Sequence, residues 1–313
     1  MSLSVCNFNK IAIIESLPDG EMKTGKKLYD DIILINIANN ERFRISFDRV
    51  SSEIELVALL NGLYADVQEK GLYPIIHIEC HGDDERKGLV LSNKDFISWE
   101  KLYELLQSIN EVMDLNLLIV LAACFAFEMS FSVYAYQRAP FWGMLAPSEA
   151  ILPEELQKSF FSYYKTLIEN TGKQDVPNGS LALESLQSHK PQQGAINFIT
   201  AEYIFKLAFD GFMKDHNSSK AIKKQAQYIC NELRRVGVES SISVVKASIR
   251  NLRPYYLERY HKIYFMIDLC PDNINRFGYL KEDIAIKYFL YLKYDKLDSL
   301  SRQIIGFNDQ NNI

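Results

Sequence analysis

Short apolar runs alternate with helical patterns between residues 10 and 200. Amphipathic spacing over residues 51–71 and a Ser98 N-cap before residues 99–109 predict two helices. Runs rich in β-branched and aliphatic residues predict strands. These runs are KIAIIE (10–15), DIILINI (31–37), YPIIHIEC (73–80), GLVLS (88–92) and NLLIVLAAC (116–124).

The order of these segments favours an α/β fold. NLLIVLAAC is almost entirely apolar, which is typical of a strand that helices bury on both faces. We therefore expect a mainly parallel sheet between two helical layers, a three-layer sandwich. In such sheets ligands bind at the carboxyl ends of the strands. Two of the predicted strands end there in ECHG and AACFA.

The residues at these two strand ends could support nucleophilic catalysis. Because side chains alternate across a strand, His77, Glu79 and His81 share one face and Cys80 lies on the other. His81 at one strand end could approach Cys124 at the end of another strand, as a thiol nucleophile and its base require. The backbone N–H of the glycine after His81, Gly82, could stabilise an oxyanion. A helix beginning just after Cys124 would favour its thiolate.

A metal site is the alternative interpretation of the same strand. His77, Glu79 and His81 could offer three ligands to zinc, as in a zinc-dependent hydrolase. The sequence shows no fourth ligand and no general base beside them. His77 is then better explained as a buried, hydrogen-bonded structural histidine.

Composition narrows the class of protein. The chain has 313 residues, is 48% hydrophobic and carries a formal charge of −5, with no basic stripe that would indicate a nucleic-acid partner. Its five cysteines are widely spaced, without a CxxC pair, as expected of reduced thiols in a cytoplasmic protein. The longest apolar run, residues 117–127, is too short to span a membrane, and the N-terminal residues lack a signal-peptide pattern.

Beyond about residue 195 the pattern changes to helices. The segments 199–216, 219–237, 241–269 and 281–297 have helical periodicity, and Tyr and Phe are dense between residues 255 and 292. We therefore predict a first domain over residues 1–194 and a mostly helical C-terminal region over 195–313 that regulates the first domain or binds a partner.

Three segments resemble one protein family. IIHIECHG (75–82), GLVLSNKDFISWEKLYELL (88–106) and LLIVLAACFA (117–126) are similar, in this order and spacing, to the caspase-like CHAT peptidases. Those proteins carry a strand ending in His-x-x-Cys-His-Gly and a second strand ending in a small residue and the nucleophilic Cys. The resemblance extends over roughly residues 10–190 and includes RAPFWGMLAPSE (138–149).

The resemblance implies a caspase-like fold and a cysteine endopeptidase without a cofactor. His81 matches the catalytic histidine, Cys124 the nucleophile, and the backbone amides of Gly82 and Cys124 the oxyanion donors. Phe125, directly after the nucleophile, would shape a substrate subsite. The resemblance further implies a regulated role in bacterial defence against phage, in which the enzyme cleaves a partner such as a gasdermin-like effector and is switched by an activating or inhibitory partner.

The acidic run Asp83, Asp84 and Glu85 follows the histidine and Gly82. A loop at this place would overlook the cleft. We therefore expect these carboxylates either to form a solvated turn or to contribute a subsite for a basic side chain. A catalytically silent scaffold that binds a partner peptide in the same cleft is the remaining alternative.

Overall fold

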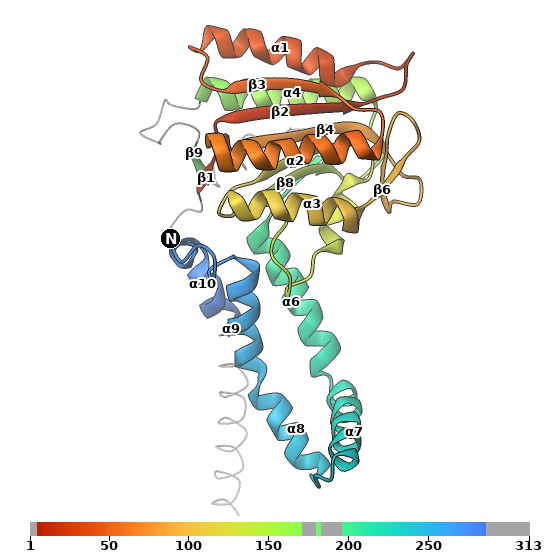
Figure 1. The fold of residues 1–313 in the computed structure, drawn as a ribbon, viewed down its shortest axis with the longest axis vertical. Helices are drawn as coiled ribbons and strands as arrows, with labels where there is room; N and C mark the ends of the chain where they lie inside the picture. Colours follow the sequence, from red (N-terminus) through yellow and green to blue (C-terminus); the bar gives the residue numbers. More distant parts are fainter. Residues whose placement is uncertain (1–4, 171–179, 183–195, 286–313) are drawn as a thin grey trace, which may run out of the picture.

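The computed structural model describes residues 5–170, 180–182 and 196–285. Its main sheet is shown in Figure 1. Neighbouring strands are parallel except at one edge, where the pair of β10 and β8 is antiparallel. The strand order is β10 (Ile196–Thr200), β8 (Gly143–Pro147), β7 (Leu118–Ala122), β4 (Pro74–Gly82), β2 (Lys10–Ser16) and β3 (Arg44–Arg49).

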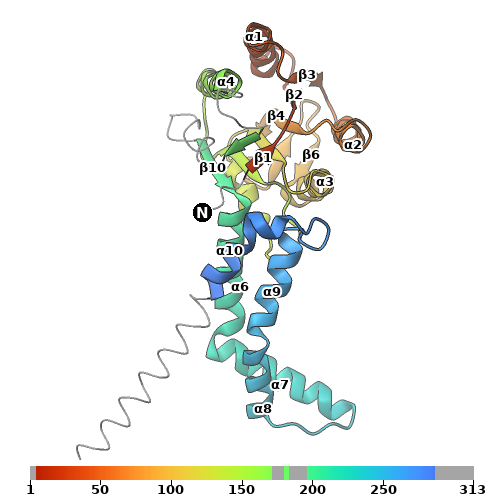
Figure 2. The ribbon, with the colours of Figure 1, turned by 90° about the vertical axis from the view of Figure 1, so that its left-hand side faces the viewer.

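Helices cover both faces of this sheet. α1 (Thr24–Ala38) and α4 (Pro153–Asn170) pack together on one face, and α2 (Glu53–Lys70) and α3 (Trp99–Val112) pack together on the other. Figure 2 shows the two helical layers on opposite sides of the strands. The prediction of an α/β fold with a mostly parallel sheet is confirmed.

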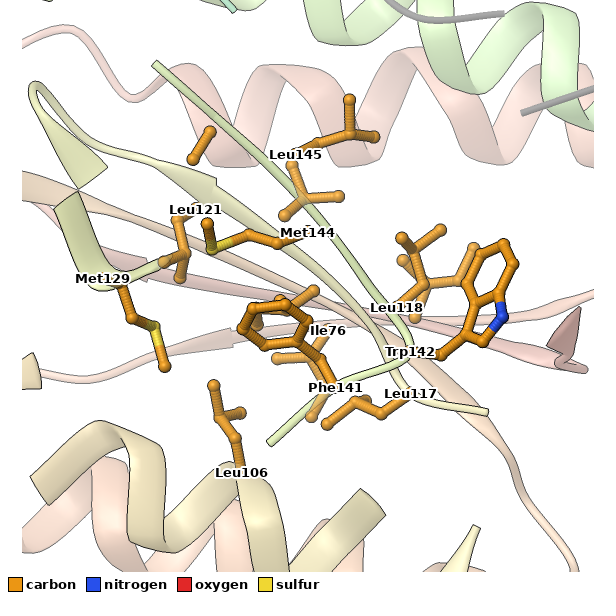
Figure 3. Close-up of a cluster of buried hydrophobic side chains, with 14 of the residues drawn as sticks. Ile76, Leu106, Leu117, Leu118, Leu121, Met129, Phe141, Trp142, Met144 and Leu145 are labelled. Carbon is orange, nitrogen blue, oxygen red and sulfur yellow. The ribbon is translucent and has the colours of Figure 1, made fainter. Parts of the chain in front are cut away.

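The core lies between the central strands and the helices. Figure 3 shows fully buried side chains of β7, β8 and α3 meeting there, among them Leu121, Met144 and Leu106. Met129 joins them from the 3₁₀ helix η1 (Ala126–Ser132). The segment that follows Cys124 is thus anchored in the core by its own apolar side chains.

Two smaller strand pairs complete the β structure. A hairpin of β5 (Gly88–Val90) and β6 (Phe96–Ser98) extends the tip of β4, with His81 opposite Val90 and Gly82 opposite Leu89. β1 (Val5–Asn7) pairs with β9 (Ser180–Ala182) in a separate two-stranded sheet. The hairpin matters for function because it fixes the backbone at the end of β4.

One predicted strand is wrong. Residues 31–37, DIILINI, lie within helix α1. The strand that follows β2 along the chain is instead β3, which pairs with β2 at the edge of the sheet. A buried stripe of Leu28, Ile32 and Asn36 at helical spacing turns this segment toward the core. At the helix start, the carboxylate of Glu15 accepts a hydrogen bond from the backbone N–H of Lys26 at 3.0 Å.

The described part of the C-terminal region is mostly helical, and the predicted helix over residues 281–297 lies outside the described residues beyond residue 285. The described helices are α6 (Ala201–Asn217), α7 (Ser219–Arg235), α8 (Ile242–Asn251), α9 (Arg253–Tyr264) and α10 (Asn273–Ala285). Phe205, Tyr264 and Phe277 belong to the same buried cluster as the sheet, whereas α7 and α8 share a small core of their own. Figure 1 shows α7 and α8 farthest from the sheet.

The expected domain boundary at residues 194 and 195 lies outside the described residues. The first described element beyond it is β10, which is a strand of the main sheet. No helix of the described residues is long and apolar enough to cross a membrane.

Candidate active site

The tips of β4 and β7 meet through their backbones. The two strands are parallel neighbours, with Glu79 opposite Ala122, so the residues beyond this pair emerge at the same edge of the sheet. There the Cα of Gly82 lies against the carbonyl group of Cys124, and a Cβ atom on residue 82 would overlap that oxygen. His81 and Cys124 are therefore held at adjoining positions, as the strand ends predict.

A cavity of about 300 Å³ lies at this junction. His81 and Cys124 both line it; the His81 side chain is half-exposed, and Cys124 is partly buried. Most of the remaining wall is apolar and comes from the loop before α1, the end of β7 and the start of α4. These wall residues are Leu17, Met22, Ala122, Ala123, Ile151, Pro153 and Leu156, and Glu21, Thr24, Glu79 and Cys80 complete the lining.

The nucleophile candidate sits on a sharp turn. The Cys124 Sγ is 3.9 Å from the carbonyl oxygen of Ile151, a weak contact that leaves the sulfur accessible from the cavity. Phe125 adopts a left-handed backbone conformation with φ 59°, and its N–H donates to the carbonyl of Glu149 at 3.4 Å. The helix that follows is the short 3₁₀ helix η1, not an α-helix. The expected stabilisation of a Cys124 thiolate by a regular helix N-terminus is therefore not supported.

His81 is bound on one side by a carboxylate. Its Nε2 lies 2.8 Å from Oε2 of Glu21, and both side chains are about half-exposed, at 51% and 44%. Because a carboxylate only accepts hydrogen bonds, the imidazole Nε2–H donates. The other ring nitrogen, Nδ1, makes no hydrogen bond to any residue that the structure describes. The ring thus keeps one nitrogen for a proton from a neighbouring group.

One backbone N–H group at the junction has no backbone acceptor among the described residues, and a second is directed away from the β5 hairpin. The N–H of Asp83 donates to the carbonyl of Gly88 at 3.0 Å in the β4–β5 hairpin. Because N–H groups alternate in direction along a strand, the N–H of Gly82 points away from β5. The N–H of Cys124 donates to no other backbone group within the described ranges. This arrangement suits the two expected oxyanion donors.

His77 is buried and structural, as the sequence analysis favours. Its Nδ1 lies 3.2 Å from the hydroxyl of Tyr164 on α4, and its ring packs edge-on against Phe160. Burial lowers the pKa of His77 to about 3, so this imidazole is neutral. A neutral ring held by α4 orients the strand but does not reach the cavity.

Glu79 forms a buried acidic pair with Glu15 beneath the start of α1. The two residues lie opposite each other on β4 and β2, and a side chain at Gly25 would overlap Oε2 of Glu79. Glu79 also hydrogen-bonds Thr24. Burial and, less strongly, the charge of Glu15 raise the pKa of Glu79 to about 8. Glu79 is therefore protonated at neutral pH, while its edge contributes to the cavity wall.

The three side chains of the zinc alternative do not converge. His77 binds Tyr164, Glu79 lies under α1, and His81 is exposed beside Glu21. His77 Nε2 and Glu79 Oε2 are 4.0 Å apart, and neither atom has a hydrogen-bond partner in the part of the chain that the structure describes. Among residues 5–170, 180–182 and 196–285, no group of three or more His, Cys, Asp or Glu side chains could hold a metal ion.

The expected subsite residues lie beside the cavity, not in its wall. Asp83 closes the β4–β5 turn by accepting a hydrogen bond from the N–H of Lys87, whose side chain pairs with Glu85. Asp84 is exposed. Phe125 packs under the Arg86 guanidinium, whose central carbon is 4.2 Å from the ring centre. None of Asp83, Asp84, Glu85 and Phe125 lines the cavity.

Sequence reasoning missed Glu21, the carboxylate closest to the histidine. It lies in the loop between β2 and α1, 60 positions before His81, and no motif marks it. The available signal was topological: a loop that follows a strand next to β4 must lie at the same carboxyl edge.

Searches of protein-family models and of curated proteins find no match to this chain.

Proposed function

We propose that this chain is a cysteine endopeptidase with a caspase-like first domain and a His81/Cys124 dyad. The observation that carries the proposal is the contact of Gly82 with the Cys124 carbonyl, with both dyad side chains lining one cavity. A metal-independent thiol mechanism needs these two groups at adjoining places beside free backbone donors. The sequence resemblance to CHAT peptidases supports the same assignment.

In this mechanism His81 takes the thiol proton and the Cys124 sulfur attacks the scissile carbonyl carbon. The N–H groups of Gly82 and Cys124 stabilise the resulting oxyanion. His81 then gives its proton to the leaving amine, and the acyl group remains on the sulfur as a thioester. A water molecule, deprotonated by His81, hydrolyses the thioester and regenerates the thiol.

The biological role that we propose rests on the resemblance alone. The enzyme would be a regulated effector in bacterial anti-phage defence that cleaves a partner protein, for example a gasdermin-like pore former. The helices beyond β10 offer a place for an activating or inhibitory partner. Their position supports coupling to the site, because Phe205 and Tyr264 of this region lie in the same core as the sheet.

The experiment that tests the proposed chemistry needs no known substrate. Wild type, Cys124→Ala, Cys124→Ser and His81→Ala are incubated with the proteins encoded beside this chain and with a mixed peptide library. New termini are mapped by mass spectrometry. Cleavage that both Cys124 variants abolish and His81→Ala reduces at least about a hundredfold is the expected result. Equal cleavage by Cys124→Ala would exclude the dyad, and peptide binding without any cleavage would favour the scaffold alternative.

A further inference from the structure

The carboxylate of Glu21 is placed to control the orientation of His81. The two side chains are joined by a single hydrogen bond of 2.8 Å, and both line the cavity that contains Cys124. An imidazole at the end of a strand can rotate about its side-chain bonds. Only a partner on one ring nitrogen fixes which nitrogen carries the proton and which faces the thiol.

The loop that carries Glu21 is itself tied to the sheet. Lys23 Nζ donates to the carbonyl oxygens of Leu17, at 2.6 Å, and Pro18. The Glu21 N–H donates to the Pro18 carbonyl at 3.3 Å, and Arg49 from β3 donates to the Leu17 carbonyl, also at 3.3 Å. The loop that carries Glu21 is thus held by several interactions, one of them from the Glu21 N–H, which distinguishes Glu21 from an acid on a free surface loop.

We propose that Glu21 is the positioning residue of the site: it accepts the His81 Nε2–H bond and so leaves Nδ1 unprotonated to receive the Cys124 proton. This inference rests on the proposed function for its catalytic meaning. When His81 takes the proton, the carboxylate faces the imidazolium and stabilises it. Glu21 makes no contact with the reacting atoms and acts through His81.

The same loop provides a matched control. Asp19 is two residues before Glu21, and its carboxylate binds Arg49 at 2.7 Å rather than His81. Asp19→Asn removes one negative charge from the loop and leaves the His81 hydrogen bond in place. The comparison therefore separates a specific bond to His81 from the general electrostatic effect of the loop.

The first measurement is the alkylation rate of Cys124 by iodoacetamide in the full chain. Cys270→Ser is the background, because Cys270 is the other thiol that is not fully buried among the described residues. Glu21→Ala should lower the rate about tenfold or more, Glu21→Asp should restore part of it, and Asp19→Asn should leave it within about twofold. Thermal unfolding should be unchanged in all three, because half-exposed ion pairs add little to stability.

The second measurement reads the histidine directly. In full-length Cys124→Ala protein with ¹⁵N-labelled histidine, the His81 ring should be mainly the Nε2–H form. Adding Glu21→Ala should convert it to a mixture of tautomers, whereas adding Asp19→Asn should not. This readout is independent of peptidase activity, so it decides the role of Glu21 even if His81→Ala leaves thiol reactivity unchanged and thereby overturns the dyad.

Two outcomes would overturn the inference. An unchanged His81 tautomer and an unchanged Cys124 alkylation rate in Glu21→Ala would show that the hydrogen bond between Glu21 and His81 is a surface interaction without a positioning role. A faster alkylation in Glu21→Ala would show that Glu21 holds His81 away from the thiol, which is an inhibitory contact and the opposite of positioning.

Discussion

The backbone of Gly82 lies so close to the carbonyl oxygen of Cys124 that no side chain fits between them. This contact joins the ends of two parallel strands at the positions where a histidine and a cysteine emerge. Glycine is needed at residue 82 for close approach of two backbones rather than for an unusual backbone angle, since its φ is not positive.

Replacement of Gly82 by alanine should therefore damage the site. The added methyl group would overlap a backbone carbonyl that cannot move independently, so the tips of β4 and β7 must separate. We expect a loss of about 1–3 kcal/mol in the free energy of unfolding, measured by urea denaturation, and a loss of peptidase activity.

Gly62→Ala is the matched control. Gly62 is exposed in the middle of helix α2, and a Cβ there would meet no atom of the described residues within 4 Å. Alanine should stabilise the protein by about 0.5–1 kcal/mol through its higher helix propensity, with activity unchanged. Equal effects of the two substitutions would contradict the contact between the strand tips.

The strand ends of the site could be predicted from sequence because they depend on local pattern. The run before His81 is apolar except for His77 and Glu79, and the run before Cys124 is uninterrupted. Both predict strands, and parallel strands place their carboxyl ends at one edge. The alternation of side chains also placed His77 and Glu79 together on the α1 and α4 face.

Other features depend on tertiary contacts that no local pattern encodes. DIILINI has the composition of a strand, but its buried stripe of Leu28 and Ile32 and the Glu15 carboxylate at its start favour a helix. Glu21 reaches His81 only because β2 and β4 are neighbours in the sheet. Such pairings require the sheet order, which the sequence pattern left open.

Cys124 should be the first thiol to react with iodoacetamide. Cys6, Cys80 and Cys230 are buried, and burial raises the pKa of Cys6 to about 12 and that of Cys80 further. Cys270 is partly exposed, but burial raises its pKa as well, so it should react second. Peptide mapping after brief labelling measures the order. Modification of Cys270 before Cys124 would contradict the proposed activation of Cys124.

Glu79→Gln should change how stability depends on pH. The pKa of Glu79 is raised from its ordinary 4.5 to about 8 in the folded protein, so the folded state binds the proton more tightly than the unfolded state. Its contribution is fully present below pH 4.5 and is lost as pH rises toward 8, with a limiting slope of about 1.4 kcal/mol per pH unit.

The measurement is urea denaturation between pH 6.5 and 8.5. In this range His77, whose pKa is lowered by burial from its ordinary 6.5 to about 3, is neutral in the folded protein but still binds protons in the unfolded chain near pH 6.5. Both proteins contain His77, so this contribution cancels in the comparison. Wild type should lose stability more steeply than Glu79→Gln up to about pH 8, and the difference between the two slopes should shrink above that pH. If the unfolding free energies of the two proteins depend on pH in the same way from pH 6.5 to 8.5, Glu79 is ionised in the folded protein over this range, which would contradict a neutral Glu79.

The side chains that line the cavity predict which substrate residue precedes the scissile peptide bond. An aspartate there would need arginine or lysine side chains in the wall, and the described lining contains none. The acidic residues Asp83 and Asp84 do not line the cavity, whereas Glu21 and Glu79 do.

We therefore expect cleavage after a long apolar or basic residue and not after aspartate. The walls formed by Met22, Ile151 and Leu156 suit an aliphatic chain, and the Glu21 carboxylate would attract a cationic end and repel an anionic one. Matched peptides that differ only in this residue, as Leu, Met, Lys, Arg, Asp or Glu, test this with wild type and Cys124→Ala. Cys124-dependent cleavage confined to the Asp peptide would show that the substrate side chain binds elsewhere, nearer Arg86. A preference for Lys over Met that weakens with added salt would identify electrostatic attraction as the deciding interaction, because salt screens exposed charges but leaves apolar packing intact.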